Sequence, residues 1–157
     1  MVAANDENLL SKIDEARSYT IEQVSERTGL TKRTLRYYEE VGLLPPTGRT
    51  EGNYRRYSEE DVARLERIKK LRDLMGFSLS DIRELLEADD ERGHIKAAYK
   101  QETDNTAKIA QLDRSDELIR RQLHLIEEKL AGLEEMRASL LAKLERHKGV
   151  REKLRAQ

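Results

Sequence analysis

The chain contains no cysteine, only two prolines and few aromatic residues, which make up 4% of the sequence. Without cysteine it has no disulfides, no thiolate ligands for a metal and no cysteine nucleophile. No apolar run approaches the roughly 20 residues that a helix needs to cross a bilayer. The N-terminal segment 1–18 is acidic and lacks the apolar core of a signal peptide. We therefore expect a soluble, cytoplasmic protein with no membrane partner.

Features of an enzyme are missing as well. The sequence has no glycine-rich loop that could cradle a phosphate, and no plausible pair of nucleophile and base. Its three histidines, His94, His124 and His147, are widely separated, and each is better explained as a surface or helix-packing residue than as a zinc ligand. We expect no catalysis, no metal and no cofactor.

Charged residues are abundant instead, at 39% of the chain against 37% for hydrophobic residues. This composition is lean for a single globular core of 157 residues. It suits a helical protein with a modest core and a long, solvated helical part. The expected fold class is therefore mainly α.

Two short helices are predicted near the N-terminus of the ordered part. Thr20 and Gln23 form a capping box for the first helix, and Gly29 can end it in a left-handed cap. Thr31 can begin a second helix only two residues later. Two short helices around a tight glycine turn are typical of a helix-turn-helix.

A β-hairpin, or wing, is predicted next. Pro45 and Pro46 stop the second helix, and residues 54–57 can form a short strand that pairs with residues near Leu44. A third helix begins at Ser58, with the apolar face Val62, Leu65, Ile68, Leu71, Leu74 and Met75. A fourth helix begins at Ser78 and carries Leu79, Ile82, Leu85 and Leu86. We expect this domain to cover residues 19–88, after a flexible arm at 1–18.

The C-terminal part is predicted to be a coiled coil. A break is expected at 89–93, and a linker or helical insert at 89–108. The poor helix formers at 103–106 indicate a kink or a late helix start, and the sequence leaves open whether 94–113 continues into the coil. From residue 109 to 147 apolar residues recur in heptads, which is typical of a coiled coil, and 148–157 form a tail. The expected dimerisation residues are Ile119, Leu123, Ile126, Leu130, Leu133, Leu140 and Leu144.

Asp116 and Arg137 interrupt this heptad series. A lone helix would leave its leucine stripe in water, so it needs a partner, and another copy of the chain is the simplest one. We therefore expect a homodimer.

The second short helix carries a cationic face. Arg33, Arg36 and Tyr37 share one outward side, opposite Leu35 and Tyr38. Residues 32–72 contain eleven Lys and Arg against seven Asp and Glu, a local excess that suits phosphate contacts. The candidate DNA-binding residues are Thr31, Lys32, Arg33, Arg36, Tyr37, Tyr38, Arg49, Tyr54, Arg55, Arg56 and Tyr57.

Alternatives exist for some of these residues. The pattern favours packing in the core for Tyr38, and Tyr57 can also pack. Arg55 or Arg56 can pair with Glu39 or Glu40 in place of a phosphate. For the whole protein, the alternative is a coiled-coil scaffold that holds protein partners and whose helix-turn-helix does not bind DNA.

Residues 19–87 resemble the N-terminal domain of the MerR family of bacterial transcription regulators. The resemblance is carried by TLRYYEEVGLLPP (34–46), GNYRRY (52–57) and GFSLSDIREL (76–85). It implies a winged helix-turn-helix DNA-binding domain followed by a long antiparallel coiled-coil dimerisation helix. It also implies that a homodimer binds a near-palindromic promoter element and distorts an overlong spacer, so that RNA polymerase engages both promoter boxes.

The resemblance implies a role for individual residues. Thr31, Arg33 and Arg36 would lie at the major groove, and Tyr37 and Tyr38 would meet the DNA backbone. On the wing, Arg49 would contribute to binding, Arg55 would bind phosphate, and Tyr57 would brace the structure.

Two departures from the family limit what the chain can sense. Metal-sensing members use cysteines, which this sequence lacks, and drug-sensing members carry a large C-terminal domain, whereas only a short segment follows the heptads here. The operator, the regulated genes, the sign of regulation and the identity of any small-molecule effector stay open.

Overall fold

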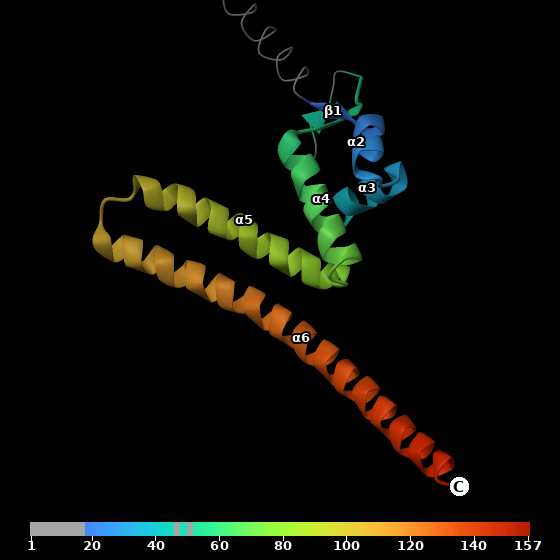
Figure 1. Ribbon diagram of the computed structural model, residues 1–157. Coiled ribbons are helices and arrows are strands. Elements are labelled where there is room, and N and C mark those ends of the chain that lie inside the picture. Colours follow the sequence, from blue (N-terminus) through green and yellow to red (C-terminus); the bar gives the residue numbers. More distant parts are fainter. Residues whose placement is uncertain (1–17, 46–47, 50–51) are drawn as a thin grey trace, which may run out of the picture. The chain divides into compact units, whose positions relative to one another are not determined.

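The computed structural model describes residues 18–45, 48–49 and 52–157, so the expected N-terminal arm lies outside it apart from Ser18. The chain forms two compact units, Met1–Leu86 and Glu87–Gln157. The first holds a small sheet and short helices, and the second is entirely helical (Figure 1), which confirms the mainly α class. None of the described helices is both long and apolar enough to span a membrane.

The helix-turn-helix forms as predicted, from α2 (Ile21–Thr28) and α3 (Lys32–Glu40). The Thr20 hydroxyl accepts a hydrogen bond from the backbone N–H of Gln23 at 3.2 Å, and the Gln23 side chain accepts one from the N–H of Thr20 at 2.9 Å. Gly29 adopts φ 73°, and Thr31 caps α3. These contacts satisfy backbone groups that the helix ends leave without partners.

The wing consists of strands β2 (Gly48–Arg49) and β3 (Arg55–Tyr57). β3 pairs antiparallel with β2 on one side and with β1 (Tyr19–Thr20) on the other. The predicted pairing of this strand with residues near Leu44 is therefore wrong. The backbone N–H groups of Leu43 and Leu44 both bond to the Tyr38 carbonyl, so this segment turns into the core directly after α3.

The third helix, α4 (Glu59–Asp73), starts at a capping box made by Ser58 and Asp61. Val62, Leu65, Ile68 and Leu71 are buried as predicted, but Leu74 and Met75 are 78% and 45% exposed. The helix ends at Asp73, and the chain turns through Gly76 at φ 67°, so Phe77 is buried in their place.

The next helix, α5 (Leu79–Gln101), follows Ser78, whose hydroxyl accepts a hydrogen bond from the N–H of Asp81 at 3.1 Å. It runs without interruption through 89–93, so the predicted break is wrong. Gly93 does not adopt the left-handed conformation that ends a helix. A helical glycine costs only about 1 kcal/mol relative to alanine, which the surrounding turns tolerate.

The late helix start predicted around 103–106 is confirmed. The last helix, α6 (Asn105–Arg155), follows a short turn, and the Asp104 carboxylate caps it by accepting from the N–H of Ala107 at 2.8 Å. Residues 94–113 therefore span the end of α5, the turn and the start of α6.

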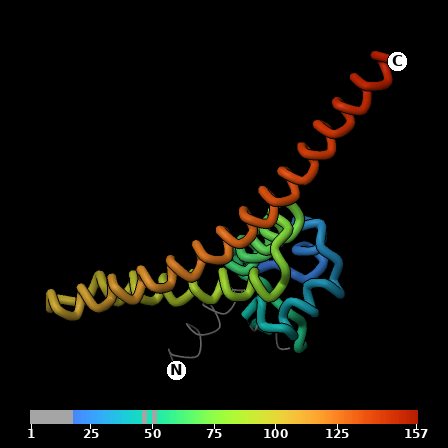
Figure 2. Tube along the Cα trace, turned by 90° about the horizontal axis from the view of Figure 1, so that it is seen from below, coloured from blue at the N-terminus to red at the C-terminus, as the bar shows by residue number. Residues whose placement is uncertain are grey.

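Within the second unit, the end of α5 and the start of α6 lie side by side and run in opposite directions (Figures 1 and 2). Arg114 donates to both carboxylate oxygens of Glu91, at 2.7 and 3.1 Å, and Gln122 donates to Asp89 at 2.8 Å. Leu118 is almost fully buried. Leu118 is not part of the predicted heptad seam; it lies on a different face of α6, which packs within the chain.

The predicted seam lies on another, exposed face of α6. From Leu123 to Leu144 its apolar members are between 40% and 61% exposed, and Ile119 is half-buried. A single chain thus covers one face of α6 and leaves the leucine stripe in solvent.

Candidate nucleic-acid interface

The recognition surface starts on α3, which has one buried and one exposed side. Leu35 and Tyr38 are buried, whereas Arg33, Arg36 and Tyr37 are exposed. This division follows from helical spacing, because residues three and four apart share a face. The predicted outward face is therefore confirmed as an exposed surface.

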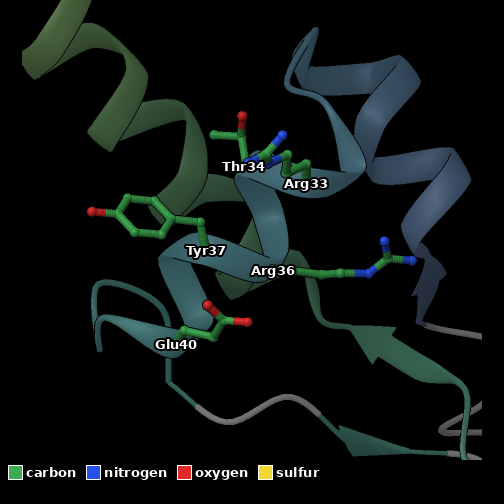
Figure 3. A pocket seen from close by; sticks show the side chains of 5 residues that line it. All are labelled: Arg33, Thr34, Arg36, Tyr37 and Glu40. Atoms are coloured by element: carbon green, nitrogen blue, oxygen red, sulfur yellow. The ribbon is translucent and has the colours of Figure 1, made fainter.

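Two shallow pockets lie along this surface. The first, of about 500 Å³, is lined by Arg33, Thr34, Arg36, Tyr37 and Glu40 (Figure 3). The second, of about 410 Å³, is lined by Thr20, Ile21, Glu22, Arg36, Asn53, Tyr54, Arg55 and Arg56. Arg36 belongs to both, and in Figure 3 its side chain extends from α3 away from Tyr37. The exposed face of α3 is thus continuous with the wing through one arginine.

Among the residues that the structure describes, neither Arg33 nor Arg36 makes a hydrogen bond or ion pair. The other cations nearby are engaged. Lys32 pairs with Glu22 at 3.0 Å, and Arg56 donates to the side chain and carbonyl of Ser18 at 2.9 and 3.1 Å. A guanidinium without an internal partner keeps its planar fork available for an anion or a base edge.

The wing arginines meet an acidic residue of α3. Arg55 Nε donates to Glu39 Oε2 at 2.8 Å, and Arg49 Nη2 lies 3.9 Å from Glu39 Oε1. The alternative in which Arg55 pairs with Glu39 is therefore confirmed. Arg56 points elsewhere, to Ser18.

Two of the eleven candidate residues do not belong to the exposed surface. Tyr38 is 1% exposed and Tyr57 is fully buried. The Tyr38 hydroxyl accepts a hydrogen bond from Arg72, whereas the Tyr57 hydroxyl has no partner among the described atoms. Burial raises the pKa of both phenols. Both rings pack in the core, which confirms the alternative stated for them and removes them from the exposed surface of the candidate interface.

The sequence reasoning missed three basic side chains that hold the helix-turn-helix in place. Lys69 donates to the carbonyl of Thr28 at 2.7 Å, Arg64 donates to that of Leu43 at 2.6 Å, and Arg83 donates to that of Val41. The carbonyls of Thr28 and Val41 lie at the C-terminal ends of α2 and α3, where cations are favoured, and that of Leu43 lies in the turn after α3. The charge excess of residues 32–72 hints at Arg64 and Lys69, whereas Arg83 lies outside that range.

Metal sites require clusters of ligand side chains. Within residues 18–45, 48–49 and 52–157, no group of three or more His, Asp or Glu side chains could hold a metal ion. The chemistry of the site is that of arginine forks and tyrosine hydroxyls on an exposed helix and its wing.

Comparison with known proteins gives consistent matches. The family model described as MerR HTH family regulatory protein matches residues 19–89. The HTH-type transcriptional regulator YfmP of Bacillus subtilis is 37% identical over 120 residues, which is 76% of this chain and 86% of that protein. The nodulation protein NolA of Bradyrhizobium elkanii is 46% identical over 71 residues, covering 45% of this chain but only 32% of NolA.

Among solved structures, the MerR family regulator HiNmlR, which lacks the sensor domain and is bound to promoter DNA, aligns with a TM-score of 0.42 at 24% identity, over 73% of this chain and 79% of that one. The family model spans the whole winged helix-turn-helix, and the similarity to YfmP covers about three quarters of this chain. The chain therefore belongs to the MerR family of helix-turn-helix transcriptional regulators.

Proposed function

We propose that this DNA-binding regulator, which is not an enzyme, binds a near-palindromic promoter element as a homodimer, with α3 in the major groove and the wing on the flanking phosphates. The observation that carries the proposal is the pair Arg33 and Arg36, which are exposed on one face of α3 and engaged by no other described residue. Within a cluster of otherwise paired charges, two such guanidiniums favour an external anionic partner.

The chemistry of α3 suits the edge of a base pair. Arginine can donate two hydrogen bonds to O6 and N7 of guanine, and a good bidentate contact discriminates by about 1–3 kcal/mol. Thr31 and Lys32 at the start of α3 are exposed and can reach phosphate oxygens. Tyr37, 46% exposed, adds a hydroxyl on the same side of the domain.

The wing extends this surface. Tyr54 is 74% exposed, and Arg49 lies on the outer strand β2. Contacts of this type position a protein on the duplex but carry little sequence information. We assign base reading to α3 and backbone contacts to the wing.

Dimerisation would occur through the exposed stripe of α6, which runs from Leu123 to Leu144. Apolar stripes of this length are rare on the surfaces of monomers and mark association sites. Pairing two α6 helices buries both stripes, and the family resemblance favours an antiparallel arrangement. A dimer also supplies two recognition helices, as a near-palindromic site requires.

Distortion of an overlong promoter spacer would follow from this arrangement. Bending a site of 20–30 base pairs costs about 1–6 kcal/mol, which backbone contacts from two subunits can offset. RNA polymerase would then be affected indirectly, through the shape of the promoter. We place this activity in the cytoplasm, with any small-molecule effector unassigned.

The test is an Arg36→Ala variant, measured by fluorescence anisotropy on a duplex selected from genomic fragments by the wild-type protein. We expect binding to weaken by about 1–3 kcal/mol and sequence preference at the contacted base to relax. Arg155→Ala, which removes the same charge at the end of α6, is the matched control. Unchanged specific binding by Arg36→Ala would remove α3 from the groove.

A further inference from the structure

Glu39 is an acidic residue in a place that disfavours one. It lies in the last turn of α3, where the helix macrodipole opposes a negative charge. Its side chain is only 16% exposed, so part of its hydration is lost. It also lies beside the surface that we propose meets phosphates. These three costs indicate that its partners are what hold the carboxylate there.

Both oxygens of this carboxylate face the wing. Oε2 accepts from Arg55 at 2.8 Å, and Oε1 lies 3.9 Å from Arg49. Arg49 and Arg55 are direct cross-strand neighbours in the β2–β3 register. Like charges placed opposite each other destabilise a strand pair. The Glu39 carboxylate therefore offsets the repulsion between the two guanidiniums by attracting both of them.

Strand β3 is also held by its pairing with β1 and by the buried Tyr57, whereas the outer strand β2 pairs with β3 alone. The strands of the wing contain two and three residues, and short hairpins are marginally stable in water on their own. Within the wing, Arg49 also donates to the carbonyl of Asn53, at 3.2 Å. Through Glu39, the strands are tied to the helix that carries Arg33 and Arg36.

We propose that Glu39 is a positioning residue for DNA binding. It holds Arg49 and Arg55 against α3, so that the wing and the recognition helix meet the duplex at a fixed spacing. Arg36 and Arg55 line the same pocket, so this tie orients the wing directly beside a groove-facing arginine. The inference rests on the proposed function and adds a residue whose own charge opposes DNA.

The negative charge of Glu39 makes the direction of the affinity change diagnostic. By charge alone, removing a carboxylate close to phosphates tightens binding. A positioning role predicts the reverse, because the wing loses its anchor. Glu40 is the matched control: it is the next residue, exposed, lines the α3 pocket, and makes no hydrogen bond or ion pair among the described residues.

The experiment compares full-length wild type, Glu39→Gln, Glu39→Asp and Glu40→Gln on the selected duplex and on a scrambled duplex of the same composition, by anisotropy over a range of salt. We expect Glu39→Gln to weaken specific binding about fivefold, the loss expected from one partly buried ion pair. Its log affinity should fall less steeply with log salt than that of wild type, because each lost phosphate contact removes about 0.9 from the slope. Glu40→Gln should bind as tightly as wild type or tighter, with an unchanged slope.

Glu39→Asp keeps the charge and should restore most of the affinity. Circular dichroism at the assay temperature checks that every variant is folded, and Glu39→Ala, which also removes the carboxylate, carries the comparison if Glu39→Gln is not. Glu39→Gln binding as tightly as wild type, or matching Glu40→Gln in affinity and slope, overturns the inference alone. Wild type that ignores both duplexes overturns the proposed function, and the two failures are therefore distinguishable.

Discussion

Two charged residues, Asp116 and Arg137, interrupt the heptad series of α6, and they allow a strict test of the dimer. Leu112 is a further exposed apolar residue of α6, in the heptad series before Asp116. If it lies opposite the partner's Leu144 in an antiparallel pair, Leu123 lies opposite the partner's Leu133 and Ile126 opposite the partner's Leu130. In the same register Asp116 is three residues, about 4.5 Å along the axis, from the position facing the partner's Arg137. In a parallel pair Asp116 would face the partner's Asp116 instead.

The perturbation is a charge reversal, Asp116→Arg or Arg137→Asp, which replaces an opposite-charge neighbour by a like-charge one at two symmetric sites. Both side chains are exposed in the single chain, at 57% and 67%. An exposed ion pair contributes about 0.2–1 kcal/mol, and a like-charge pair costs a similar amount. Over two sites the loss is about 1–4 kcal/mol, which is a factor of about 5 to 1,000 in the dimer dissociation constant.

Sedimentation equilibrium measures that constant directly. We expect each single variant to dissociate at higher concentration than wild type, and the double variant D116R/R137D to recover most of the affinity. Glu135→Arg, a charge reversal on an exposed position outside the stripe, is the control. A double variant weaker than either single variant, or single variants that match the control, would refute the antiparallel register.

Two further outcomes are expected. Leu130→Glu puts two carboxylates into the stripe centre and should weaken dimerisation and operator binding together; a fully dimeric variant by gel filtration at micromolar concentration would remove the assigned seam. Tyr57→Phe removes a buried hydroxyl that has no hydrogen-bond partner among the described atoms, so the free energy of unfolding from urea titration should change by less than about 1 kcal/mol. Because burial raises the pKa of Tyr57 above its ordinary value, the folded state holds its proton more tightly. The stability from this group is therefore present below about pH 10 and lost as pH rises through the folded pKa, and Tyr57→Phe should show a shallower loss in that range. An equal loss in both proteins would mean that Tyr57 does not contribute.

The local chemistry of helix ends was predictable from the sequence. Helix caps involve residues that are close together in the sequence, so their spacing alone predicts the cap. This holds for the capping boxes of Thr20 with Gln23 and of Ser58 with Asp61, and for the left-handed cap at Gly29. The outward face of α3 was predictable for the same reason. The position of a residue along a helix determines which face its side chain lies on, and Arg33 and Arg36 lie on the exposed face as expected.

Features that depend on distant residues were not predictable in this way. The strand β1 contains only two residues and has no periodicity of its own, so its pairing with β3 emerges only in the fold. The run 89–93 contains a glycine and four charges, which indicated a break. The backbone nevertheless stays helical through this run, and Gly93 does not adopt a left-handed conformation. Leu118 was missing from the predicted seam because a single heptad stripe cannot represent a helix with two packed faces.

The structure also changes how the charge excess of residues 32–72 is interpreted. Eleven cations against seven anions suggested a broadly available basic surface. In the fold, Arg64 and Lys69 donate to backbone carbonyls, Arg72 donates to Tyr38, and Arg55 pairs with Glu39. These cations make internal contacts with α3, the wing and their neighbours, whereas Arg33 and Arg36 on the exposed face of α3 make no hydrogen bond or ion pair among the described residues. Under the proposed function, specific binding then depends on how accurately a few guanidiniums are placed, because several of the neighbouring cations are engaged in internal contacts.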